Sequence, residues 1–221
     1  MKLGFKIFAL ACWIVCAAVF VSCHHTLVKP NSVAIYYSDS KSVSLLSTSA
    51  MVGSIDEAQH LIGSFGQSLA SGASSADSAK EFSGDVWVRA NDSILSITLF
   101  GGFGMTIAEL TYANDSVSFA SSVIDVEKMK PEYVLADFQA CFYPFEALRE
   151  NFEKSGFVFS EKHTEPTATE GLASAKPSSD FERVLTDDGK VILRIVRKAN
   201  EIDLVNELRH YKYHITLGSD G

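Results

Sequence analysis

Basic residues are scarce in this chain, and they do not cluster. Lys and Arg number 19 against 27 Asp and Glu, which gives a net charge of −8. A surface that binds phosphates needs grouped Lys and Arg side chains, so we expect no nucleic acid partner. The length of 221 residues and the 47% of hydrophobic residues are enough for the core of one globular domain.

Motifs for catalysis and metal binding are also missing. No G-x-S-x-G stretch offers a nucleophilic serine. His210 and His214 are four residues apart, but on a strand they would stand about 13 Å apart, too far to share one ion. Cys141 lies between Ala140 and Phe142, where a small buried thiol is the ordinary interpretation. We therefore expect no enzyme, no metal site and no cofactor.

No apolar run is long enough to cross a membrane comfortably as a helix. Residues 7–21 are an unbroken apolar stretch preceded by Lys2 and Lys6, whereas a spanning helix needs roughly 20 such residues. This is the layout of a secretory signal. We predict that residues 1–22 are a signal peptide and that residues 23–221 form a single lipoprotein domain.

The leader ends at a cysteine, Cys23, which could carry a lipid, form a disulfide, bind a metal or remain a passive thiol. Residues 20–23 resemble the bacterial lipobox, in which the cysteine becomes the N-terminus and is acylated, so we predict lipidation at Cys23. Its thiol is then consumed, and Cys141 alone cannot form an intrachain disulfide. A metal site with His24 and His25 is disfavoured because consecutive residues seldom converge on one ion. The alternative is an ordinary signal peptide that leaves Cys23 a passive thiol.

Short stretches of alternating apolar and polar residues predict antiparallel strands in the mature chain. Turn residues separate them, including Asn114-Asp115 and the hairpin signal Asp188-Gly189. The predicted strands lie within residues 33–37, 43–45, 86–88, 95–99, 105–112, 117–119, 184–185, 191–195 and 211–217.

Two stretches have the spacing of amphipathic helices. In residues 54–69, Ser54 and Glu57 form a capping box ahead of an apolar stripe, and His60 points away from that stripe. Residues 144–156 have a proline in the first turn and a glycine at the C-terminal cap. The apolar face of this second helix should lie over the sheet and consists of Phe145, Leu148 and Phe152.

Three further segments are predicted to be loops. Gly101, Gly102 and Gly104 surround Phe103 and predict an exposed turn with an apolar residue at its tip. Residues 70–80 are small and polar. Residues 160–180 are polar with Pro and Thr, and we predict a flexible loop there.

Three longer stretches carry a resemblance to a known family. "ITLFGGFGMTIAELTY", "YVLADFQACFYPFEALRENFEKSGF" and "FERVLTDDGKVILRIVRKANEIDLVNELRHYKYHITL" look like the outer-membrane lipoproteins related to LolB and LolA. They are more closely similar to a lipoprotein family encoded beside aryl-polyene or unusual fatty-acid synthesis genes. Gly102-Phe103-Gly104 matches the turn of that pattern, and Tyr143-Pro144 with Leu148 matches its aromatic-Pro helix start. The resemblance covers residues 82–217.

The resemblance implies a mainly β fold of the α+β class, a strongly curved, incomplete antiparallel barrel closed by helices. In this fold an apolar cavity binds acyl chains, and the turn at Phe103, flanked by Gly102 and Gly104, touches the membrane. Short alternating strands with few amphipathic helices agree with such a sheet, whose apolar face must be buried against something. The expected cavity-lining residues are Leu95, Ile97, Leu99, Met105, Phe119, Phe145, Leu148, Phe152, Leu193 and Ile195.

Three functions follow from these expectations. The first is a lipid-anchored protein that binds acyl chains of a lipid or lipoprotein and helps deliver them to the outer membrane, with a periplasmic carrier protein as a possible partner. The second is a lipoprotein with a filled core that scaffolds an envelope export or synthesis machine. The third is an enzyme acting on a lipid precursor. The residue after Cys23 is His rather than Asp, which in the lipoprotein sorting pattern favours the periplasmic face of the outer membrane.

Overall fold

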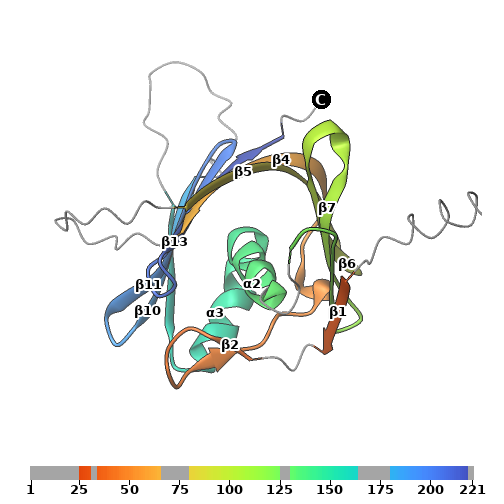
Figure 1. Cartoon of the computed structure of the whole chain (residues 1–221). Coiled ribbons are helices and arrows are strands. Elements are labelled where there is room, and N and C mark those ends of the chain that lie inside the picture. The colour runs from red at the N-terminus through yellow and green to blue at the C-terminus, as the bar shows by residue number, and fades with distance from the viewer. Residues whose placement is uncertain (1–24, 31–33, 66–79, 125–129, 164–179, 219–221) are drawn as a thin grey trace, which may run out of the picture.

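The computed structural model describes residues 25–30, 34–65, 80–124, 130–163 and 180–218 (Figure 1). Cys23, the whole predicted leader, most of the predicted loop at 70–80 and most of that at 160–180 lie outside the described residues. The large sheet comprises β1 (His25–Pro30), β8 (Ser116–Ser121), β7 (Thr106–Ala113), β6 (Ile94–Phe100), β5 (Lys80–Ala90), β4 (Ile55–Phe65), β13 (Tyr211–Leu217), β12 (Glu201–Asn206), β11 (Lys190–Lys198), β10 (Phe181–Asp187) and β9 (Val158–His163), in spatial order.

The fold is mainly β, as predicted, and all eleven strands of this sheet pair antiparallel with their neighbours. A small second sheet pairs β2 (Ile35–Tyr36) with β3 (Ser42–Val43). Two α-helices, α2 (Pro131–Phe142) and α3 (Phe145–Glu153), lie on one side of the large sheet, which bends around them (Figure 1). We call this side the inner face and the opposite side the outer face.

The sheet is open, and the prediction of a strongly curved barrel is corrected in this respect. Strands β1 and β9 stand at the two ends of the strand order and do not pair with each other, and the sheet is not strongly curled. The two helices provide the physical reason, because they cover much of the inner face. The apolar side of the sheet is therefore buried without edge-to-edge closure.

The predicted hairpin turns are confirmed. Asp188 and Gly189 join β10 to β11 with φ values of 49° and 80°, and Asn114 and Asp115 join β7 to β8 with φ values of 48° and 53°. Positive φ at both central residues is the geometry that matches the twist of two-residue hairpins. Short polar residues and glycine tolerate it, which is why these turns are readable from the sequence.

The predicted helix at residues 54–69 is wrong, because residues 55–65 form strand β4 and residues 66–69 lie outside the described residues. Over its whole length β4 pairs with β5, and from Gln59 onward it also pairs with β13. A Cβ atom at Gly63 would lie 2.1 Å from the Phe82 ring, so this ring packs directly over the glycine and a larger residue there would have to displace it. These partners are distant in sequence, and pairing with them overrides the local capping box and apolar stripe.

Helix α2 was not predicted, whereas α3 was. Nine of the twelve residues of α2 are buried, so the helix has no polar face and its sequence shows no amphipathic period. Helix α3 begins after Pro144 and has Leu148 and Phe152 buried, as the spacing predicts. Gly156, at a φ of 79°, follows its end.

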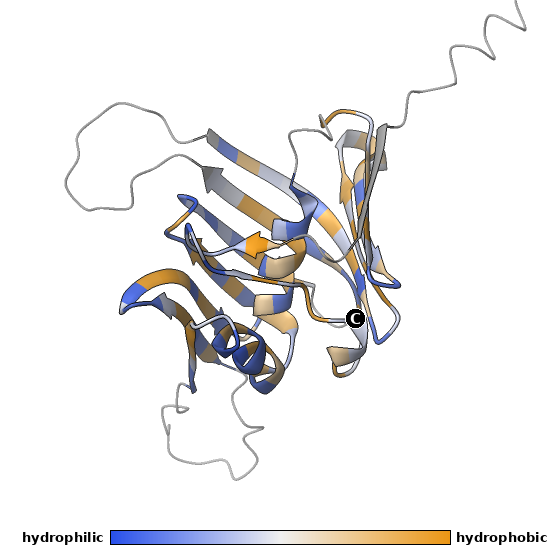
Figure 2. Ribbon diagram, turned by 90° about the horizontal axis from the view of Figure 1, so that it is seen from below, coloured by the Kyte–Doolittle hydropathy of each residue, from blue (hydrophilic) through white to orange (hydrophobic). Residues whose placement is uncertain are grey.

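Aromatic rings join α3 to the strands around it. The Phe152 ring lies 5.4 Å from Tyr37 and 5.0 Å from Phe159, measured between ring centroids, and Phe145 stacks on Phe159 at 5.5 Å. Hydrophobic and hydrophilic residues alternate along the strands, as expected of a sheet with one covered face (Figure 2).

Phe152 provides a test of this packing. We expect Phe152→Ala to lower the free energy of unfolding by about 3–5 kcal/mol, because the ring is buried and its removal leaves a cavity. Urea denaturation measures the loss. Val158→Ala is the matched control, since Val158 is exposed on the neighbouring strand, and its effect should stay within about 0.5 kcal/mol. A small loss in Phe152→Ala would show that the ring is not part of the packed core.

Candidate functional site

The residues predicted to line a cavity divide into three groups in the structure. Six of them are packed in the core, each 3% exposed or less: Leu95, Phe119, Leu148, Phe152, Leu193 and Ile195. Ile97, Leu99 and Phe145 are half-buried. Met105 is not inside at all; it is 65% exposed, because it is the last residue of the loop between β6 and β7.

A strip of half-buried apolar residues crosses the inner face. Ile97 and Leu99 pair across the strands with Val88 and Val86, which are buried on the helix side, so they face inward as well. The same side of β5, β4 and β13 carries further half-buried residues at matching register. We call this set the inner strip, and it comprises Leu61, Phe82, Ile97, Leu99, Tyr213 and Ile215.

The β6–β7 loop carries a cluster of exposed apolar side chains. Phe103 is fully exposed, with a φ of 63°, and a Cβ atom at Gly102 or Gly104 would meet nothing within 4 Å. The predicted exposed turn is therefore confirmed, and its ring does not fold back into the sheet. Val123, just beyond β8, is 75% exposed. We call Phe103, Met105 and Val123 the exposed tip.

The register of the strands shows which end of the sheet the exposed tip occupies. His25 pairs with Ser121, and Ser121 also pairs with Ala108, so β1 begins where β8 ends and β7 begins. The β6–β7 loop and Val123 lie at this same end. The start of the described chain and the exposed tip therefore share one end of the molecule.

A buried polar cluster lies between α2 and the sheet. The Tyr211 hydroxyl on β13 donates to Asp137 Oδ2 on α2, and Asn206 Nδ2 donates to the Tyr211 hydroxyl at 3.1 Å. Asp137 and Asn206 are both buried. This chain of hydrogen bonds fixes the middle of α2 to the ends of β12 and β13.

Arg209 extends this cluster from the β12–β13 turn. Its guanidinium carbon lies 3.9 Å from the centroid of the Tyr133 ring and 5.0 Å from that of Tyr37, and one of its N–H groups donates to the Tyr36 carbonyl. Within the described residues it forms no salt bridge. A guanidinium between aromatic faces is attracted by the ring quadrupoles.

Burial dominates the protonation of this cluster. It raises the pKa of Asp137 to about 7, against the lowering effects of the Tyr211 hydrogen bond and the Arg209 charge. Burial also raises the pKa values of Tyr37, Tyr211 and Tyr213, with a further contribution from the Asp137 charge. The Cys141 thiol is raised to a pKa of about 12, again by burial, so it is the inert buried thiol that the sequence indicates.

A buried cation, Arg183, holds the C-terminal end of α2. Arg183 Nε donates to Glu161 Oε2 at 2.6 Å, and its Nη1 donates to the carbonyls of Ala140 and Tyr143 at 2.7 and 3.0 Å. Carbonyls at a helix C-terminus have no partner within the helix. Arg183 supplies that partner and therefore has a structural role.

The outer face carries a trio that sequence reasoning did not find. His60 Nδ1 lies 2.7 Å from Asp85 Oδ1, and His60 Nε2 lies 3.0 Å from Ser83 Oγ. This is the connectivity of a hydrolase triad, brought together by the β4–β5 pairing. The His60 and Asp85 side chains are 46% and 76% exposed, however, so the trio lacks the shielding from water on which such catalysis depends.

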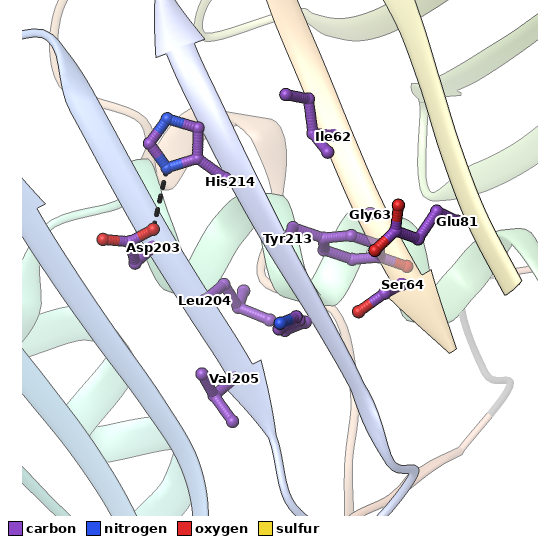
Figure 3. Close-up of a pocket in the computed structure, with 10 residues that line it drawn as sticks. Ile62, Gly63, Ser64, Glu81, Asp203, Leu204, Val205, Tyr213 and His214 are labelled. Atoms are coloured by element: carbon purple, nitrogen blue, oxygen red, sulfur yellow. Dashed lines mark hydrogen bonds and ion pairs between the residues drawn. The ribbon is translucent and has the colours of Figure 1, made fainter. Parts of the chain in front are cut away.

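Near this trio, a depression of about 330 Å³ lies over β4, β12 and β13 (Figure 3). His214 borders it and bonds to Asp203 at 2.8 Å. In the described part of the chain, no three His, Cys, Asp or Glu side chains are grouped to hold a metal ion. The helices that the structure describes include none long and apolar enough to cross a membrane.

Asp137 makes stability depend on pH in a defined direction. Its pKa in the folded chain, about 7, lies above its ordinary value of 3.8, so between these pH values the folded chain holds a proton that the unfolded chain has lost. The contribution of Asp137 to stability therefore falls as pH rises from about 4 to 7. We expect the unfolding free energy of wild type, relative to Asp137→Asn, to fall by up to about 4 kcal/mol over this range.

Urea denaturation of both proteins at a series of pH values measures this difference. The subtraction removes the contributions of the other carboxyl groups, which the two chains share. Parallel pH profiles for wild type and Asp137→Asn would contradict a raised pKa at Asp137.

One comparison with known proteins gives a match. Residues 57–219, more than half of the chain, match the model of a family described as a protein of unknown function, DUF3261. No curated protein matches the chain. The matched range contains helices α2 and α3, strand β4 from its third residue, strands β5 to β13 and the inner strip. The chain therefore belongs to the DUF3261 family of proteins of unknown function.

Proposed function

We propose that this protein is a lipid-anchored envelope protein that binds acyl chains against the inner face of its sheet and helps deliver them to the outer membrane. The observation that carries the proposal is the inner strip. Its six apolar side chains are half-buried on the side of the sheet where the core is otherwise closed. When a hydrophobic ligand covers apolar surface that is left partly exposed beside a core, the free energy of the system falls, so binding there is favourable.

The dimensions of the inner strip suit an acyl chain. It crosses β13, β4, β5 and β6, and three strand spacings of about 4.8 Å give it a length of about 14 Å. Each methylene group removed from water contributes about 0.8 kcal/mol. Several such groups give firm binding without a covalent bond, so the ligand stays releasable. The finer form of the proposal, a LolA- or LolB-like carrier, rests on the resemblance and on this strip.

The exposed tip supports work at a membrane surface. Phe103, Met105 and Val123 expose apolar side chains at the end of the sheet where β1 begins. Cys23 precedes His25 by two residues, and two residues of chain span at most about 7 Å. A diacylated Cys23 would therefore tether this end to the bilayer, and paired acyl chains are needed because a single one binds membranes only marginally.

A second candidate function is a scaffold that carries no ligand. The observation in its favour is the complete burial of Leu95, Leu193 and Ile195, which pack as a core rather than line an open cavity. Extraction of the purified protein and mass spectrometry of the extract separate the two functions. Bound acyl species in the extract support the carrier. An extract of fully folded protein that contains no acyl species supports the scaffold.

Leu99 tests the inner strip directly. We expect Leu99→Trp to lower the amount of co-purified acyl lipid by about tenfold or more, because the larger side chain occupies space on the strip that the ligand needs. Thr98→Trp is the matched control, since Thr98 is the adjacent residue and faces outward opposite Trp87. Equal lipid content in wild type and both variants would contradict acyl binding at the strip.

Phe103 tests the membrane contact. We expect Phe103→Glu to slow transfer of a fluorescent acyl ligand into vesicles by roughly tenfold, because a charged side chain is costly to bring into the acyl region of a bilayer. The thermal midpoint should not change, since Phe103 is fully exposed.

Val52→Glu serves as the control for Phe103→Glu. Val52 is 77% exposed and precedes the start of β4, at the end of that strand away from the exposed tip. A transfer rate that is the same in all three proteins would remove the exposed tip from the mechanism.

A further inference from the structure

Three polar atoms of the buried cluster between α2 and the sheet have no hydrogen-bond partner among the described residues. They are Tyr37 Oη, Asp137 Oδ1 and Arg209 Nη1. Tyr37 is 1% exposed and Asp137 is 5% exposed, so water outside the protein does not reach them. An unsatisfied buried polar group is destabilising, so three of them in one cluster point to a group that is bound there.

The chemistry of these atoms defines the missing group. Arg209 offers an N–H donor and a positive charge, and within the described residues it has no carboxylate partner in a salt bridge. Tyr37 offers a hydroxyl close to that charge, since its ring lies 5.0 Å from the guanidinium carbon. Asp137 adds an oxygen that donates when the acid is protonated, as burial allows near neutral pH. The N–H of Arg209 and the hydroxyl of Tyr37 can both donate, and protonated Asp137 can share its proton with the ligand. These groups together suit a ligand with an anionic oxygen.

We propose that Tyr37, Asp137 and Arg209 bind the carboxylate of a long-chain fatty acid. This inference rests on the proposed binding of acyl chains and names their head group. A carboxylate carries one charge, which the single guanidinium matches. A phosphate monoester carries close to two charges, and with Asp137 beside it such a head would leave negative charge buried without compensation.

A continuous line of aromatic rings connects this site to the inner strip. Tyr211, which donates to Asp137, lies 4.9 Å from Tyr213 between ring centroids, and Tyr213 lies 6.1 Å from Phe82. Tyr213 and Phe82 belong to the inner strip. A carboxylate at Arg209 therefore places the acyl tail so that it runs past Tyr213 onto the strip.

The Tyr37 hydroxyl gives the sharpest test, because Tyr37→Phe removes one oxygen for which the described part of the chain offers no hydrogen-bond partner. The binding of dodecanoate and of methyl dodecanoate is compared on nanodiscs that carry the full-length protein, with empty nanodiscs subtracted. We expect wild type to prefer the acid over the ester, and Tyr37→Phe to reduce this preference by about tenfold, the effect of losing one hydrogen bond to a charged group. Its ester affinity and thermal midpoint should not fall.

Tyr143→Phe is the matched control. Tyr143 is also a buried tyrosine, but it stands at the far end of α2, ten residues and about 15 Å along the helix from Tyr133, which contacts Arg209. It should leave the preference for the acid unchanged. Arg209→Lys keeps the charge but loses the planar fork, and it should weaken acid binding without changing ester binding.

The outcomes separate this inference from the proposed function. Equal affinities of wild type for acid and ester, or a preference that Tyr37→Phe leaves intact, would overturn the carboxylate site while acyl binding stands. Tighter binding of dodecyl phosphate than of dodecanoate would also overturn it and assign a phosphate head group. If neither acid nor ester binds to wild type, the proposed function itself fails.

Discussion

The docking of helix α2 on the inner face of the sheet is the constraint on which the rest of this structure depends. Hydrogen bonds hold it at three points: Asp137 accepts from Tyr211, Gln139 bonds both the N–H and the carbonyl of Leu46, and Arg183 donates to the last carbonyls of the helix. Apolar packing alone would allow the helix to slide. These polar ties have defined geometry, and they fix its register against the sheet.

The position of α2 decides how the inner face is used. Where the helices cover it, residues such as Leu95 and Ile195 are fully buried and form a core. Where they do not, the same alternating pattern leaves Ile97, Leu99 and Ile215 half-exposed. One sheet therefore provides both a stable core and an apolar surface, and the proposed acyl binding requires both, because a ligand surface that collapsed into the core would bind nothing.

The features that the proposed function uses lie at one end of the molecule. The β6–β7 loop with Phe103, the start of β1 and the β12–β13 turn with Arg209 all lie at the end where β4 finishes and β13 begins. Antiparallel pairing is the reason, since alternate connections of such a sheet return to the same edge. A membrane at this end would meet the exposed tip, and a ligand crossing that interface would pass close to Arg209 before reaching the inner strip.

The sequence by itself determined the local features of this protein. It predicted the mainly β class, the turns at Asn114-Asp115 and Asp188-Gly189, helix α3 and the exposed Phe103, because each depends on backbone preferences and periodicity within a few residues. Only the tertiary structure decided that residues 55–65 are a strand, that the buried stretch 131–142 is a helix, and that Tyr37, Asp137 and Arg209 meet. These outcomes depend on partners far apart in the chain. Pairing with β5 and β13 outweighed a helical stripe, and burial on all sides removed the period that would have revealed α2.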